Sequence, residues 1–174
     1  MTQRMLAFSR RQSLQLEPVS IPELVFGMHT LVRQSTGSRI LVDTKFALGL
    51  PCVRADAHQL ETALLNIVLN ARDAMPDGGN IEISARVSDS LKLRSETGAS
   101  QQCVLLEITD SGEGMDDETL EKAIEPFFTT KGLADGTGLG LAIVSRVLRA
   151  NGGEDRIEQS DLGGAALVTL WPLP

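Results

Sequence analysis

Residues 56–75 read DAHQLETALLNIVLNARDAM and have the pattern of one long helix. Asp56 can cap its first turn, and the run Pro76-Asp77-Gly78-Gly79 ends it. Its expected core face comprises Leu60, Leu64, Ile67 and Val68. At about 100° per residue, Asn66, Asn70 and Asp73 fall within roughly 60° of one another on a second face.

Two asparagines on this second face, which has Leu65 and Leu69 beside it, need an explanation. A buried amide must be hydrogen-bonded, and a bound ligand or metal ion would provide the partner. The alternative is a pair of amides at a partly solvated helix surface. The helix alone does not decide between these two interpretations.

Helices and strands alternate on both sides of this helix. Ser20 and Pro22 mark the start of a first helix, in which apolar residues recur as far as Val32. We expect a later helix at 137–150 and strands at 39–48, 81–87, 104–109, 156–160 and 165–171. Because the strands often follow one another directly, this order predicts an α/β fold: a two-layer α/β sandwich with a mixed, mostly antiparallel sheet and helices on one face.

The 174 residues suffice for one domain with a short extension. We predict that residues 1–18 are the tail of an earlier element and a linker, and that residues 19–174 form the domain. A net charge of −7 argues against a nucleic-acid-binding surface, and no apolar run is long enough to span a membrane. Two isolated cysteines, Cys52 and Cys103, argue against a disulfide framework or a cysteine metal site and are typical of a reducing cytosol.

Two glycine-containing motifs are candidates for ligand contacts. Asp110-Ser111-Gly112-Glu113-Gly114 follows an apolar strand, so its first carboxylate could accept a hydrogen bond from an exocyclic amine while the glycines let the backbone approach a planar ring. Gly136-Thr137-Gly138-Leu139-Gly140 opens the later helix, where unpaired N–H groups suit a phosphate. Taken alone, the first motif is more often a plain turn, and the second is a common way to begin a helix.

A third motif, Glu125-Pro126-Phe127-Phe128-Thr129-Thr130-Lys131, lies in the stretch 112–136, which has no clear periodicity. Its two adjacent phenylalanines are more often core residues beneath a long loop, but they could form the hinge of a lid over a ligand. In that case Lys131 would reach a phosphate as a mobile positive charge.

The four motifs together closely resemble the ATP-binding catalytic domain of sensor histidine kinases. The matching segments are 66–71, 110–114, 126–131 and 136–141, and the resemblance runs from Pro18 to Pro172. It implies the Bergerat ATP-binding fold, which these kinases share with DNA gyrase, MutL and heat-shock chaperones.

The resemblance also implies roles for individual residues. Asn70 would coordinate an Mg²⁺ ion that bridges the phosphates of ATP, and Asp110 would accept a hydrogen bond from the adenine amino group. Lys131 would contact a phosphate from a lid that resembles residues 127–135. The other nucleotide contacts that the resemblance implies are Asp73, Gly112, Gly114, Met115, Thr130, Gly136, Thr137, Gly138, Leu139, Gly140 and Leu141.

Three positions distinguish this chain within the family that it resembles. Hydrolytic members have a general-base glutamate at the position of Asn66, whereas an amide cannot take up a proton, and this favours transfer to a histidine over hydrolysis. Asp73 stands where many histidine kinases have a lysine, so Lys131 or Arg72 would have to replace that phosphate contact. Ala165 stands where the final strand usually carries a threonine.

The expected activity is transfer of the γ-phosphate of ATP to a histidine on an upstream dimerisation domain. His29 and His58 lack the His-Glu or His-Asp context of an acceptor, so we expect both to be ordinary structural or surface residues. The resemblance also implies that residues 1–18 are the end of an upstream dimerisation helix and a linker, and that residues 19–174 are the catalytic and ATP-binding domain. The implied partners are the upstream domain and a response regulator receiver domain, and the chain would be a cytoplasmic, monomeric fragment of a homodimeric protein. A nucleotide-binding regulatory module without kinase activity, a Bergerat-fold ATPase and a serine kinase of the anti-sigma-factor type stay open as alternatives.

Overall fold

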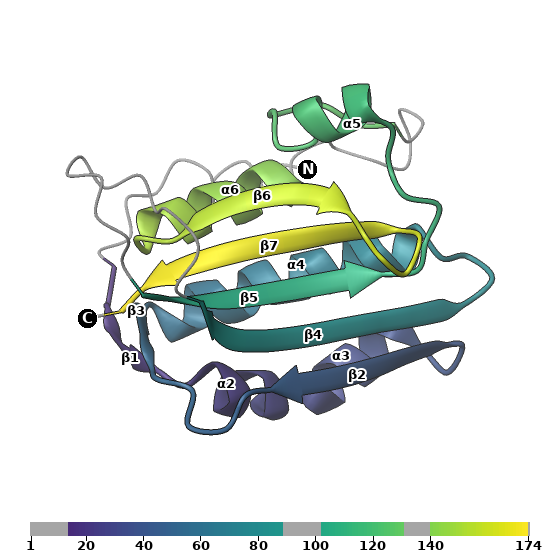
Figure 1. Ribbon diagram of the computed structural model, residues 1–174. Helices are drawn as coiled ribbons and strands as arrows, with labels where there is room; N and C mark the ends of the chain where they lie inside the picture. The colour runs from purple at the N-terminus through teal and green to yellow at the C-terminus, as the bar shows by residue number, and fades with distance from the viewer. Residues whose placement is uncertain (1–13, 89–101, 131–139, 174) are drawn as a thin grey trace, which may run out of the picture.

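The computed structural model describes residues 14–88, 102–130 and 140–173 of the chain. Its centre is a five-stranded sheet, seen face-on in Figure 1. The strands lie in the order β2 (Ile40–Phe46), β4 (Gly79–Ser88), β5 (Cys103–Asp110), β7 (Ala165–Pro172) and β6 (Glu154–Gln159). β2 pairs with β4 in parallel and the other neighbouring strands pair antiparallel, so the predicted mixed, mostly antiparallel sheet is confirmed.

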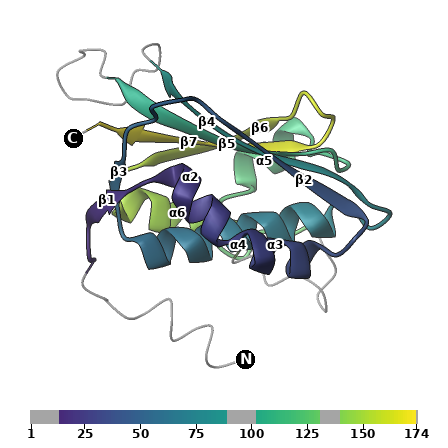
Figure 2. The same ribbon diagram turned by 90° about the horizontal axis from the view of Figure 1, so that it is seen from below.

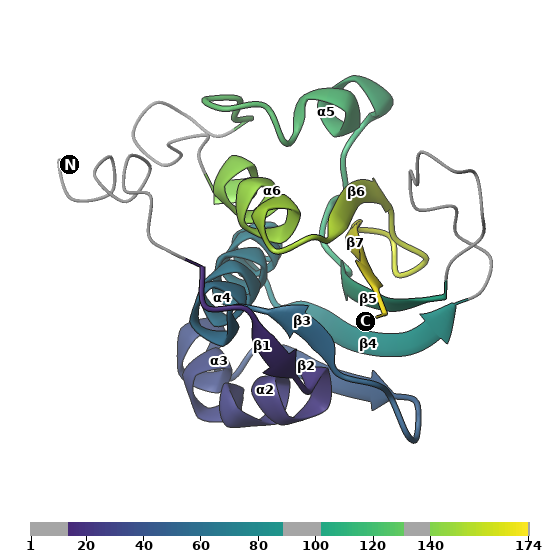
Figure 3. The ribbon, with the colours of Figure 1, turned by 90° about the vertical axis from the view of Figure 1, so that its left-hand side faces the viewer.

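Helices cover one face of this sheet. They are α2 (Ile21–Gly27), α3 (His29–Thr36), α4 (Ala57–Asp73) and α6 (Gly140–Ala150), and the chain has a further short helix, α5 (Asp117–Lys122). Figures 2 and 3 show α2, α3, α4 and α6 together on the same side of the sheet, whereas α5 lies near the β6 edge. Among the described residues, no helix combines the length and the apolar character needed to cross a membrane.

The main core lies between the sheet and α4. The four residues predicted for the core face of this helix, Leu60, Leu64, Ile67 and Val68, are all buried. From the sheet, Trp171 reaches the same core with 1% of its surface exposed. Its indole N–H donates to the hydroxyl of Thr169 at 3.0 Å, and that hydroxyl donates to the carbonyl of Leu106 at 3.2 Å. The buried polar groups of this pair are therefore satisfied within the core.

Two predicted helix caps are confirmed. The hydroxyl of Ser20 accepts a hydrogen bond from the N–H of Glu23 at 3.4 Å, and the carboxylate of Asp56 accepts one from Gln59 at 3.1 Å. The first helix differs from the prediction because α2 ends at Gly27 and α3 starts at His29. Glycine disfavours a helix interior, while the buried positions on both sides of the break keep the same spacing, so the pattern reads as one helix.

Three short elements were not predicted. β1 (Glu17–Val19) pairs antiparallel with β3 (Val53–Ala55), so the last two residues of the predicted linker belong to the folded domain. The third element is α5, whose start is capped by Asp116 through a hydrogen bond from the N–H of Thr119 at 2.8 Å. None of the six residues of α5 is buried, so this helix has no buried apolar face that a periodic sequence pattern would indicate.

Candidate functional site

Asp110 is held in a fixed orientation at the end of β5. The residue is 8% exposed, and its Oδ1 accepts hydrogen bonds from the backbone N–H groups of Gly112 at 2.9 Å and Ala165 at 3.2 Å. Oδ2 accepts no hydrogen bond from the described residues, so one oxygen of a fixed carboxylate is left for a ligand. Burial raises the pKa of the Asp110 carboxyl above its usual range, and the N–H groups of Gly112 and Ala165 oppose that rise.

The loop after Asp110 is packed tightly between two other parts of the protein. A Cβ atom on Gly112 would lie 2.8 Å from the carbonyl oxygen of Ala74, just after α4. Gly114 has a φ of +72°, and a Cβ atom there would lie 3.1 Å from the carbonyl oxygen of Gly163. Both glycines therefore have a packing role, in addition to the close approach to a planar ring that the sequence suggests.

Asn70 of the helix motif and Gly140 of the second glycine-containing motif meet where α6 begins. A Cβ atom on Gly140 would lie 3.3 Å from the Nδ2 of Asn70, so the start of α6 lies directly against this side chain. Asn70 is half-buried, and its amide makes no hydrogen bond within the described part of the chain. One turn earlier on α4, the Nδ2 of Asn66 donates to the carbonyl of Thr62 at 3.0 Å, which leaves its Oδ1 as an acceptor.

Comparison with known proteins assigns a family to this arrangement. The model of the family described as "Histidine kinase-, DNA gyrase B-, and HSP90-like ATPase" matches residues 55–174. The chain belongs to this ATPase family. Its Bergerat-type fold, predicted from the sequence, is confirmed by solved catalytic domains of histidine kinases.

Several related sequences are those of sensor kinases. The chain is 36% identical over 156 residues to sensor kinase CckA of Brucella abortus, covering 88% of this chain and 16% of CckA. It is 36% identical over 174 residues to the histidine-protein kinase AtoS of Escherichia coli, covering 98% of this chain and 26% of AtoS. For sensor histidine kinase ZraS of the same organism, the identity is 35% over 160 residues, covering 91% of this chain and 31% of ZraS. The chain therefore spans less than a third of each of these relatives.

Two solved structures have the same arrangement of elements. The mycobacterial sensor histidine kinase MprB superposes with a TM-score of 0.71 at 27% identity, covering 90% of this chain and 97% of that chain. Full-length ShkA, solved in complex with AMPPNP, gives a TM-score of 0.69 at 27% identity, covering 95% of this chain and 32% of that chain.

In this ATPase domain, Arg72 and Asp73, two and three positions after Asn70, bind each other. The Nε and Nη2 atoms of Arg72 donate to the Oδ1 of Asp73 at 3.0 and 2.7 Å, and its Nη1 donates to the carbonyl of Ser35 at 3.1 Å. Arg72 is thus held against the end of α3. Arg72, one of the two residues suggested for the phosphate contact of the missing lysine, is therefore already engaged elsewhere.

The remaining predicted site residues fall into two groups. Thr130 is exposed and Leu141 is half-buried, and neither makes a contact that identifies a role. Lys131, Gly136, Thr137, Gly138 and Leu139 lie outside the described residues, as does most of the predicted lid. Phe127 is 68% exposed with a φ of +69°, so this phenylalanine is not a core residue.

The two histidines lie on the surface. His29 is exposed at the start of α3, and the His58 side chain is 92% exposed at the start of α4, with its Nδ1 3.8 Å from the carboxylate of Glu61. Both positions agree with the expectation of ordinary surface residues.

The β6–β7 hairpin contributes to this site in a way that the sequence does not predict. The side-chain Nε2 of Gln159 donates to the carbonyl oxygen of Met115, and Ala165 supplies one of the two N–H groups on Asp110. The doublet Gly163-Gly164 was the signal available in the sequence, but no periodic pattern links Gln159 with Met115.

Proposed function

We propose that this chain is the catalytic domain of a sensor histidine kinase, which binds ATP and transfers its γ-phosphate to a histidine on a dimerisation domain elsewhere in the same protein. The kinases CckA, AtoS and ZraS support this proposal through their similarity over most of the chain. The observation that carries it is the carboxylate of Asp110, with one oxygen fixed by two backbone N–H groups and the other left for a ligand.

At the base, the Oδ2 of Asp110 would accept a hydrogen bond from the amino group of adenine. An ionised carboxylate has only acceptors, so it favours an amine over the carbonyl that guanine carries at the same ring position. The binding of AMPPNP by full-length ShkA is consistent with this type of ligand. Gly112, Gly114 and Met115 would line the base from the loop that follows Asp110.

At the phosphates, Asn70 would supply an amide oxygen to Mg²⁺. This ion fits because Mg²⁺ keeps several waters and binds through few protein oxygens together with phosphate, and the one amide beside Gly140 offers such a partial shell. When bound, Mg²⁺ would neutralise charge on the phosphate oxygens. The triphosphate would be bound and oriented by Gly140 and Leu141, together with Thr130, Lys131 and residues 136–139. Asp73 would lie near the side of the triphosphate that binds Mg²⁺.

In the transfer step, a ring nitrogen of the acceptor histidine forms a bond to the γ-phosphorus while the bond to the β–γ bridging oxygen breaks and ADP leaves. Positioning and charge stabilisation provide most of the rate in such reactions, and no base on this domain is needed. The amide of Asn66 fits this scheme because it cannot deprotonate an attacking water. Partners of the complete protein would be its own acceptor domain, in a homodimer, and a response regulator receiver domain in the cytoplasm.

A nucleotide-binding module without kinase activity is the second candidate. The observation in its favour is the carboxylate of Asp73, which stands where a lysine would contact phosphate and which is bound to Arg72. ATP binding is common to both candidates, whereas phosphorylation of an acceptor histidine is specific to the first.

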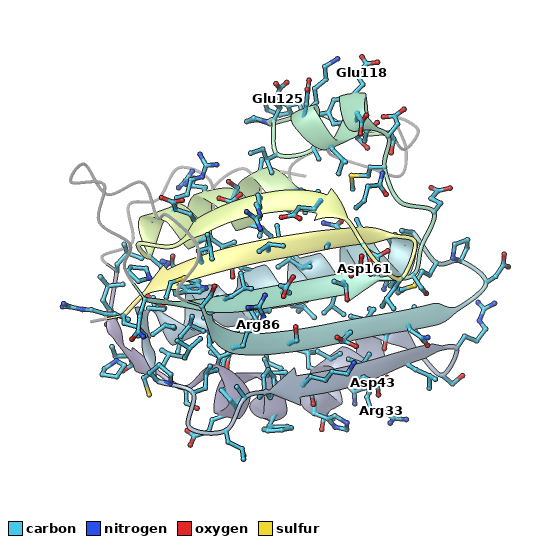
Figure 4. The ribbon with its side chains drawn as sticks, viewed as in Figure 1. Arg33, Asp43, Arg86, Glu118, Glu125 and Asp161 are labelled. Carbon is cyan, nitrogen blue, oxygen red and sulfur yellow. The ribbon has the colours of Figure 1, made fainter. Side chains whose placement is uncertain are left out.

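The first experiment is equilibrium binding of a fluorescent ATP analogue, with and without Mg²⁺, to the wild-type chain and to Asp110→Asn. The matched control is Asp43→Asn, since Asp43 is an exposed residue of β2 (Figure 4), which β4 separates from β5. We expect Mg²⁺-dependent binding that Asp110→Asn loses and Asp43→Asn keeps. Absence of binding by the folded wild-type chain would contradict both candidates. A phosphotransfer assay with the acceptor domain then separates them.

A further inference from the structure

The β6–β7 hairpin lies against the loop Asp110–Met115, named here the base loop. Two hydrogen bonds join them: the N–H of Ala165 donates to the Oδ1 of Asp110 at 3.2 Å, and the Nε2 of Gln159 donates to the carbonyl of Met115. One contact therefore lies at each end of the base loop. In Figure 4 the labelled Asp161 marks the hairpin beside the end of β5.

The hairpin also limits the base loop sterically at Gly164. A Cβ atom on Gly164 would stand 2.0 Å from the Oδ1 of Asp110 and 2.5 Å from the backbone nitrogen of Gly112. Real Cβ atoms do not approach other atoms this closely, so position 164 has no room for a side chain while the base loop stays in place. Ala74 limits the base loop in the same way at Gly112, where a Cβ atom would lie 2.8 Å from the carbonyl oxygen of Ala74.

Three hydrogen bonds around Ser160 close the turn of the β6–β7 hairpin. The N–H of Ser160 donates to the carbonyl of Gly164 at 2.8 Å, and the N–H of Gly163 donates to the carbonyl of Ser160 at 3.0 Å. The Ser160 hydroxyl accepts from the N–H of Leu162 at 3.0 Å. A turn closed in this way fixes the position of Gly164 relative to β7.

We infer that Gln159 and Gly164 are positioning residues for base selectivity. Through the β6–β7 hairpin, they hold the base loop in the position where the Oδ2 of Asp110 can accept a hydrogen bond from the base. This inference rests on the proposed nucleotide site. Neither residue touches the nucleotide itself in this scheme. Gln159 acts through the carbonyl of Met115, and Gly164 acts by leaving space for Asp110 and Gly112.

The test uses Gln159→Met, which keeps the length of the side chain but removes its N–H donor. Dissociation constants for ATP, GTP and inorganic tripolyphosphate are measured with Mg²⁺ by competition against the fluorescent ATP analogue. Loss of one hydrogen bond changes an equilibrium constant by about 2- to 10-fold. We expect the ATP constant to rise within that range, the preference for ATP over GTP to fall, and the tripolyphosphate constant to stay unchanged.

Two further variants separate positioning from general stability. Gln159→Lys restores an N–H donor of similar reach and is expected to recover most of the preference for ATP. Gln34→Met makes the same change at an exposed position of α3 and is expected to bind all three ligands as the wild type does. Gly164→Ala is added if its melting temperature shows that it folds, and its loss of preference should exceed that of Gln159→Met.

Equal losses for all three ligands, or a lower melting temperature of Gln159→Met with an unchanged preference for ATP over GTP, would overturn the inference and leave the proposed function intact. A folded wild-type chain that binds no ATP would instead overturn the proposed function, and this inference with it.

Discussion

Gly140, the first residue of α6, lies against Asn70 in the last turns of α4: a Cβ atom on Gly140 would stand 3.3 Å from the Nδ2 and 3.5 Å from the Oδ1 of Asn70. The contact places the metal candidate beside the helix whose first residues are proposed to bind the triphosphate. Any side chain at position 140 must therefore displace either Asn70 or the start of α6.

Gly140→Ala is expected to weaken the Mg²⁺-dependent part of ATP binding. The added methyl group forces a shift of a few tenths of an ångström at Asn70, while alanine favours the helix by about 0.5–1 kcal/mol over glycine. We therefore expect lower affinity for ATP with Mg²⁺, unchanged affinity without it, and no loss in the free energy of unfolding. Gly27→Ala in α2 is the control, because nothing lies within 4 Å of a Cβ atom there. Full Mg²⁺-dependent affinity in Gly140→Ala would remove Asn70 from the metal site.

Asn66→Glu is expected to raise the basal hydrolysis of ATP. The Nδ2 of Asn66 is bound to the carbonyl of Thr62, and a glutamate there would place a carboxylate base on the same face as Asn70. General-base catalysis contributes about 10²–10⁴-fold, so a rise of at least about tenfold in phosphate release is expected. Asn66→Gln, which keeps an amide of the same length as glutamate, should hydrolyse ATP as slowly as the wild type. Equal rates in both variants would undercut the role of this position.

The fold could be predicted from the sequence wherever one element buries a regular face. The helix α4 and the strands β4 and β5 have such faces, and Asp56 and Ser20 cap helices as their residue types suggest. β1 and β3 are three residues each, too short for a period, and the six residues of α5 have no buried face. Local pattern also cannot show that Gly27 ends a helix, because apolar spacing continues beyond it.

The sequence predicts candidate residues for the site, but it does not predict the contacts that these residues make. Asp110 and Asn70 stand in motifs that identify them, whereas the contacts of Gly112 with Ala74 and of Gln159 with Met115 join segments that only the folded chain brings together. The same applies to Arg72, whose hydrogen bond to the carbonyl of Ser35 depends on where α3 ends. Such contacts depend on tertiary packing, and a motif does not encode the neighbours of its own residues.

The affinity for ATP should fall in acid through the titration of Asp110. Burial raises the pKa of this carboxyl above its usual range, so it takes up a proton at a higher pH than an ordinary aspartate. The ionised form accepts the base amine, and ATP binding should weaken as the pH falls through the raised pKa. The pH dependence of protein stability does not follow from the loss of ATP binding and has its own sign. The contribution of Asp110 to the free energy of unfolding is fully present below the pKa that this carboxyl has in the unfolded state, and it is lost as the pH rises through the pKa of the folded state.

The measurement is the ATP dissociation constant over a series of decreasing pH values for the wild type and for Asp43→Asn. Both should show the same loss of affinity, because Asp43 lies on β2 away from the base loop. Asp110→Asn should bind ATP weakly at every pH, without the fall in affinity that the wild type shows as the pH decreases. A fall of equal size in Asp110→Asn would assign the titration to the nucleotide or to another group.

Asn151→Ala is expected to destabilise the domain without altering the base preference. The Asn151 side chain joins the end of α6 to the start of α4: its Oδ1 accepts the N–H of Asp56 at 2.6 Å, and its Nδ2 donates to the carbonyl of Val147 at 2.8 Å. Asn151 is 4% exposed, and its removal leaves the N–H of Asp56 without this partner, at a cost of about 1–3 kcal/mol, whereas the carbonyl of Val147 still accepts the backbone N–H of residue 151 at 3.1 Å.

Together with the contact between Gly140 and Asn70 at the opposite ends of the same two helices, Asn151 fixes the register of α6 against α4. Denaturant unfolding of Asn151→Ala should therefore show a loss of about 1–3 kcal/mol in the free energy of unfolding. Asn80→Ala, at an exposed position of β4, is the control and should lose little. The molecules of Asn151→Ala that stay folded should still prefer ATP over GTP, because the base loop does not contact Asn151. A loss of stability no larger than that of Asn80→Ala would show that α4 and α6 are held together without this amide.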